Sequence, residues 1–224
     1  MVRLIAVAFL LAAVARGTAA DKPSAKIEDT PPPKELAEPV RKLLEPKGIT
    51  ALDEKGKVIC TVWPRTALES KATAEQVSSG LKYTNLDEAT LVGAVQFPEV
   101  WGDYRKHKTK PGVYTLRLGF QPMDGDHQGT APFNDFCLLC PADLDKKPDV
   151  LEQKELFELS AKASGRKHPG VMLLFPNKKP GDAPVVESKP PDNWVLSFKI
   201  PTTAAGQKVD LGFSLVVIGQ TTAE

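Results

Sequence analysis

The stretch Val113-Tyr114-Thr115-Leu116-Arg117-Leu118-Gly119-Phe120 decides the fold class of this chain. Its large apolar side chains fall on every second residue, from Tyr114 to Phe120. Because successive side chains of a β-strand point to opposite faces, this period of two predicts a strand with one face in a core and the other nearer water. Such strands are typical of antiparallel sheets.

The same period of two recurs on both sides of this stretch. Alternating segments lie at 58–62, 91–97, 194–200 and 209–217. Two shorter apolar runs, 136–140 and 171–175, predict central strands that are buried on both faces, and 81–84 gives a weaker strand signal. The chain is therefore expected to contain about eight strands.

One predicted helix interrupts the strands. Leu156, Leu159 and Ala163 recur at helical spacing. Asp149 and Glu152 are suited to cap its start, and Gly165 is suited to end it. The 20 Pro and 16 Gly favour many short connections over a helix bundle. We therefore expect an all-β fold, a two-sheet antiparallel sandwich of jelly-roll or Ig-like order with one inserted helix.

The N-terminal residues predict export. A positive start at Arg3, an unbroken apolar run over 4–14 and small residues at 17–20 are typical of a secretory signal peptide over 1–20. Residues 21–48 are rich in Pro and charge, and predict an arm or linker that is at least partly mobile. Residues 49–224 are then expected to form the β-sandwich domain of a periplasmic or secreted protein.

The charge balance and the later hydropathy limit the partners. The net charge of the whole chain is +1, which is too balanced to argue for nucleic acid. After the leader, the sequence holds no apolar run of the length that a transmembrane helix needs, so the mature chain is expected to have no transmembrane segment. An unknown protein or glycan remains the expected kind of partner.

A Gly-rich loop between two predicted strands is the first candidate site. Asp124, Asp126 and His127 supply two carboxylates and an imidazole within four residues, which are ligand types for a divalent metal ion. Asp and Gly are also ordinary turn residues, so a structured turn is the alternative. If the strand at 171–175 runs antiparallel to the strand at 113–120, His168 joins the same end as His127. His107, before a strand of roughly 25 Å, falls at the other end.

The three cysteines give a second candidate. Cys137 and Cys140 form a Cys-x-x-Cys pattern, which suggests a thiol redox protein. Residues three apart on a strand point to opposite faces, however, and this argues against a bond between them. A disulfide from Cys60 to Cys137 or Cys140 stays open, as do buried free thiols.

A third candidate joins aromatic and basic residues. Trp101 and Tyr104 lie in a connection between strands, where aromatic side chains can contact a ligand. Arg105 opens the densest positive run of the chain, 105–110, which can hold an anionic glycan or phosphate. The alternative is that this run only keeps a hairpin tip in water.

The sequence contains none of the common nucleophile, phosphate-loop or zinc-protease motifs. We therefore expect an exported, non-catalytic β-sandwich, a binding or envelope-associated protein of unknown ligand. The rival hypothesis is a metal-binding protein or metal-dependent enzyme that uses Asp124, Asp126, His127 and His168.

Lys110-Pro111-Gly112-Val113-Tyr114-Thr115-Leu116, followed by Asp124-Gly125-Asp126-His127, resembles a pattern in exported bacterial β-sandwich proteins of unknown function. The similarity covers about Leu91 to Phe136. It implies export and a sandwich fold, and it implies no activity, cofactor or site residue.

Overall fold

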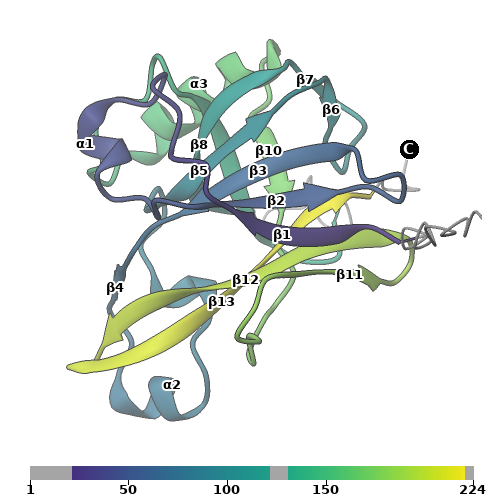
Figure 1. The fold of residues 1–224 in the computed structure, drawn as a ribbon. Helices are drawn as coiled ribbons and strands as arrows, with labels where there is room; N and C mark the ends of the chain where they lie inside the picture. The colour runs from purple at the N-terminus through teal and green to yellow at the C-terminus, as the bar shows by residue number, and fades with distance from the viewer. Residues whose placement is uncertain (1–21, 122–130, 220–224) are drawn as a thin grey trace, which may run out of the picture.

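The computed structural model describes residues 22–121 and 131–219, and they are mostly β (Figure 1). A large antiparallel sheet has the order β1-β2-β3-β5-β8-β9-β10. Its strands are β1 (Ser24–Glu28), β2 (Gly48–Leu52), β3 (Val58–Pro64), β5 (Leu91–Phe97), β8 (Gly112–Phe120), β9 (Asp135–Pro141) and β10 (Gly170–Leu173). The predicted strands at 58–62, 91–97, 113–120 and 136–140 are confirmed as members of this sheet.

A second sheet is built on a long hairpin. Its members are β11 (Val185–Lys189), β12 (Asn193–Ala204), β13 (Gln207–Ile218) and β4 (Leu68–Ser70). β4 pairs with β12 in parallel, so this sheet is not wholly antiparallel. A third, two-stranded ribbon joins β6 (Trp101–Gly102) to β7 (Lys108–Thr109).

The main hydrophobic core takes side chains from both large sheets. Leu116 and Leu118 of β8 belong to the same buried cluster as Phe213 and Leu215 of β13. These positions alternate along each strand, as the sequence predicts. Tyr83 adds a polar link across the core, because its hydroxyl donates to the carbonyl of Phe175 at 2.8 Å. Burial raises the pKa of this hydroxyl, so it stays a donor at any ordinary pH.

The segment predicted as an arm is part of the fold. β1 pairs with β2 along its whole length. The short helix α1 (Glu38–Arg41) follows, and Leu36, Val40 and Leu44 are buried against Trp63 on the face of the large sheet away from the main core. The indole N–H of Trp63 donates to the carbonyl of Thr30 at 2.8 Å. The ordered part of the chain therefore begins well before residue 49.

The inserted helix is α3 (Gln153–Ser164), which covers β9 and β10. It lies on the face of the large sheet away from the main core, the face that α1 also covers. Leu156 and Ala163 are buried, and Gly165 ends the helix in a left-handed conformation at φ 65°, as predicted. The predicted start is wrong: the helix begins at Gln153, and Glu152 makes no side-chain cap. Of the two shorter helices, α2 (Ala74–Ser78) was not expected. α1 lies within residues 34–44, where the helical spacing of the apolar side chains allows a short helix.

Two of the weaker strand predictions fail. Residues 83–85 form a turn of 3-10 helix, not a strand. β10 is the edge strand of the large sheet, not a central one. Its side chains are nevertheless largely buried because α3 covers one face and the second sheet lies on the other. Within the described residues, no helix is long and apolar enough to cross a membrane.

A buried ion pair explains where the helix starts. Arg117 of β8 has no exposed surface, and its guanidinium donates twice to the carboxylate of Asp145, at 2.7 and 2.8 Å. Its remaining donors reach the carbonyls of Ala89, Lys147 and Asp149. All five N–H groups of the guanidinium are thus satisfied. Because residues 145–149 wrap around this side chain, the carbonyl of Asp149 accepts from Arg117 and the helix begins only after the wrapped segment.

We expect the substitution Asp145→Asn to lower the free energy of unfolding by about 3 kcal/mol or more, since it leaves the charge of Arg117 buried without a counter-ion. Denaturant unfolding followed by tryptophan fluorescence measures the change. Asp87→Asn is the matched control, because it removes only the partner of the exposed Lys71 and should cost less than about 1 kcal/mol. Equal losses in the two variants would contradict this role of the ion pair.

Candidate ligand-binding cavity

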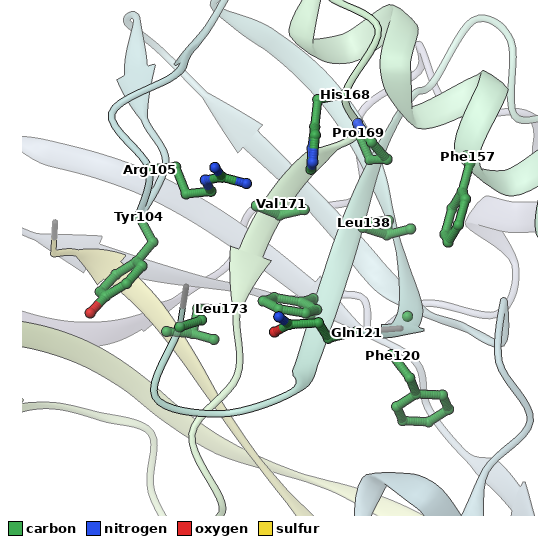
Figure 2. Close-up of a pocket in the computed structure, with 13 residues that line it drawn as sticks. Tyr104, Arg105, Phe120, Gln121, Leu138, Phe157, His168, Pro169, Val171 and Leu173 are labelled. Carbon is green, nitrogen blue, oxygen red and sulfur yellow. The ribbon is translucent and has the colours of Figure 1, made fainter. Parts of the chain in front are cut away.

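A cavity of about 300 Å³ lies between α3, the turn from β6 to β7, and the strands β8 to β10 (Figure 2). This volume is at the lower end of the range for small-molecule sites. Most of its wall is apolar. The large apolar side chains are Phe120, Phe136, Leu138, Phe157, Val171 and Leu173. Tyr104, Arg105, Gln121 and His168 add the polar groups.

The positions of the residues that form the cavity walls follow from the local sequence. Leu138 of β9 and Val171 of β10 are register partners, and both face α3. Phe157 lies one residue after the buried Leu156, so it reaches the edge of the helix face rather than its centre. Gly119 leaves room beside Leu138, because a Cβ there would come within 3.0 Å of the Leu138 side chain. The cavity is thus an unfilled part of the layer between helix and sheet.

Contacts of Asp103 stabilise the turn from β6 to β7. Its carboxylate accepts from the backbone N–H of His107 at 2.7 Å and lies 3.3 Å from the ring nitrogen Nδ1 of the same residue. Burial raises the pKa of Asp103, and the hydrogen bonds from His107 and Arg105 oppose that rise. The turn in between carries Arg105, whose guanidinium points over the cavity in Figure 2.

The three predicted ligand-binding residues have different environments. Tyr104 and Arg105 both line the cavity. Tyr104 is buried with Leu173 and Phe175, while Arg105 is exposed at the rim. Trp101 is buried: its ring stacks on Phe97 at 4.9 Å between centroids, and its N–H donates to the carbonyl of Val217 at 2.9 Å. Trp101 therefore anchors the turn, and it does not line the cavity.

His168 lies at the opposite end of the sheet from the one expected. β10 is antiparallel to β9, and β9 is antiparallel to β8, so β10 runs in the same direction as β8. The condition on which the pairing with His127 depended is therefore not met. His168 instead lies beside His107, with 6.3 Å between the ring centroids.

The predicted metal site falls mostly outside the described residues. Asp124, Asp126 and His127 belong to 122–130, which the structure does not describe. Within 22–121 and 131–219, no three His, Cys, Asp or Glu side chains gather as a metal site requires. The metal hypothesis stays a prediction for the residues at 124–127.

All three cysteines are buried, free thiols. Cys60 and Cys137 both face the main core, but β5 and β8 separate their strands, and three strand spacings amount to about 14 Å. A disulfide needs Cα atoms within about 7 Å, so the open disulfide prediction from Cys60 does not agree with this strand order. Cys140 faces α3, on the other side of the sheet from Cys137, as the strand period predicts.

Sequence reasoning missed the cavity itself. It indicated Tyr104, Arg105 and His168 separately, and it gave no role to Phe157 or Val171. These side chains come from three elements, the β6–β7 turn, α3, and β10 with the segment that leads into it, and no local sequence pattern indicates that they meet. The only sequence signal was the position of Phe157 at the margin of the apolar helix face.

Comparisons with protein-family models, with curated proteins and with solved structures give no match to this chain. The resemblance to exported bacterial β-sandwich proteins therefore stays a prediction. The cavity is interpreted below from its own geometry. Among the described residues that line it, the ionisable side chains are Tyr104, Arg105 and His168, so it offers apolar contact together with hydrogen-bond donors.

We expect none of the three thiols to react with a disulfide reagent in the native protein, and all three to react after unfolding. The thiolate is the reactive form, and burial raises the pKa of Cys60 and of Cys140 to about 12. Thiol titration with and without denaturant, in the absence of reductant, measures this. A Ser188→Cys variant, exposed on β11, is the positive control and should react at once. Fewer than three thiols after unfolding would reveal a disulfide.

Proposed function

We propose that this chain is an exported, non-catalytic binding protein, and that its cavity holds a small apolar ligand. The observation that carries the proposal is the cavity itself. Phe120, Phe157 and Val171 border it and stay partly accessible, although apolar side chains of this size normally bury themselves. A concave apolar site with a few polar groups at its rim is the usual form of a small-molecule site.

We also propose that the two large sheets form a sandwich of jelly-roll or Ig-like order. The shared core of Leu116, Leu118, Phe213 and Leu215 supports face-to-face packing of this kind. The proposal of export has support from the predicted signal peptide, and the buried cysteines are compatible with it. Buried thiols of raised pKa survive in an oxidising compartment without forming disulfides.

The apolar walls of the cavity and its polar rim contribute to ligand binding in different ways. Burial of apolar ligand surface supplies the favourable free energy, at roughly 25 cal/mol per Å². The walls are pre-formed on strands and on α3, so the ligand does not have to order them.

We expect an uncharged naphthylamine dye, which fluoresces in apolar surroundings, to bind saturably with one site per chain. The substitution Val171→Trp should weaken that binding about tenfold or more, because the indole occupies the cavity. Val185→Trp is the matched control: Val185 is a partly exposed strand residue of β11 that does not line the cavity, and its variant should bind as the unmodified protein does. The measurement is a fluorescence titration at constant protein concentration.

Two outcomes would contradict the proposed function. One is binding without saturation, as at a generally apolar surface. The other is equal weakening in the Val171→Trp and Val185→Trp variants. A thermal unfolding profile for each variant, compared with that of the unmodified protein, distinguishes a filled cavity from a damaged fold.

A further inference from the structure

The tripeptide Arg-Lys-His occurs twice in this chain, at 105–107 and at 166–168. The first copy lies in the turn from β6 to β7, and the second follows α3. These segments are far apart in the sequence, yet α3 packs against β7. The ring centroids of His107 and His168 are 6.3 Å apart. The fold therefore brings the two copies side by side.

The two segments are strongly basic. Residues 104–112 and 162–170 contain seven Lys and Arg and no Asp or Glu, in a chain whose net charge is only +1. Each histidine adds a further positive charge when it is protonated. Such a concentration of one sign at one place raises the local concentration of anions.

These two segments form a basic surface, and acidic side chains offset the positive charge of only its outer part. Glu35 and Asp143 line a separate hollow together with Lys108, Lys110 and Lys162. Asp103 is buried, and its carboxylate is occupied by His107. None of these carboxylates lines the apolar cavity. The cation at the cavity rim, Arg105, therefore faces the cavity without an acidic side chain among the described residues that line it.

The basic surface and the apolar cavity share two residues, Arg105 and His168. Figure 2 shows the guanidinium of Arg105 and the ring of His168 on the same side of the cavity, turned toward each other above Val171. The aromatic side chains Phe120 and Phe157 lie away from this pair. A ligand in this cavity thus meets positive charge at one end and apolar walls at the other.

We propose that the two Arg-Lys-His segments form an anion site at the mouth of the cavity, and that the ligand is a single-chain amphiphile with a negatively charged head group. This inference rests on the proposed function, because the apolar tail occupies the cavity. A guanidinium suits a carboxylate or phosphate head group by donating two parallel hydrogen bonds. Nucleic acid fits less well, since Tyr104, the aromatic residue next to the first Arg-Lys-His segment, is buried and does not offer its ring for base stacking.

The test compares three ligands whose main chains each contain eight carbons, the carboxyl carbon of octanoate included. Octanoate, octanol and octyltrimethylammonium carry a negative, a neutral and a positive head group, and calorimetry or displacement of the uncharged dye measures their affinities. We expect octanoate to bind about tenfold or more tightly than octanol, as a hydrogen bond to a charged group implies. Octyltrimethylammonium should bind more weakly than octanol. Octyl phosphate, as a fourth ligand, distinguishes a phosphate head group from a carboxylate.

The variants Arg105→Gln and His168→Gln should remove most of the advantage of octanoate and leave octanol unchanged. Lys154→Gln is the matched control, because Lys154 is an exposed residue of α3 that does not line the cavity. Its variant should keep the full advantage. Raising the ionic strength should reduce the difference between octanoate and octanol, since screening weakens interactions between exposed charges.

The outcomes separate this inference from the proposed function. If octanoate and octanol bind equally, or if the cation binds best, the anion site is wrong while the apolar cavity stands. If none of the three ligands displaces the dye and the dye itself does not saturate, both proposals are wrong. If Lys154→Gln lowers octanoate binding as much as Arg105→Gln does, the effect is one of overall charge and the site is not at Arg105.

Discussion

The bonds of Arg117 are the constraint on which the rest of this structure depends. A guanidinium without exposed surface is tolerated because Asp145 and three carbonyls satisfy all of its donors. Thr115, on the same face of β8, donates to the same carboxylate. The pair fixes residues 145–149 against the outer face of the large sheet, and this decides where α3 begins. A buried charge of this kind favours one arrangement of the segment around it, because other arrangements leave the guanidinium without its partners.

The candidate site is a consequence of that arrangement. α3 supplies Phe157 and leads into the second Arg-Lys-His segment, while the turn from β6 to β7 supplies Tyr104 and the first. Trp101 anchors the turn to β13 through a hydrogen bond from its indole N–H, and the carboxylate of Asp103 accepts a hydrogen bond from the backbone N–H of His107. The sheet strands β8, β9 and β10 form the floor of the cavity, and these two covering elements form its sides. The site therefore lies between two covering elements, and each is anchored by a buried polar contact rather than by apolar packing alone.

Sequence reasoning predicted the elements that depend on the local periodicity of apolar side chains or on helix-end residues. The strands around Leu116, Val95 and Cys137, and the end of α3 at Gly165, all follow from alternation or from helix-end chemistry. It failed where tertiary contacts decide. The Pro-rich segment has few apolar residues, yet Leu36, Val40 and Leu44 suffice to cover Trp63. The direction of β10 depends on its pairing with β9, and that direction placed His168 beside His107. No pattern in the sequence identifies such a pairing.

The most direct test follows backbone amide signals by nitrogen–proton NMR while octanoate is added to the protein. We expect the shifted signals to come from three separate segments, 104–107, 119–121 and 168–173, and to change together with a single affinity. Only a site assembled between the β6–β7 turn, the end of β8 and the start of β10 produces that combination. Shifts confined to one segment, or spread over β4, β11 and the distant end of the β12–β13 hairpin, would contradict a ligand site in this cavity.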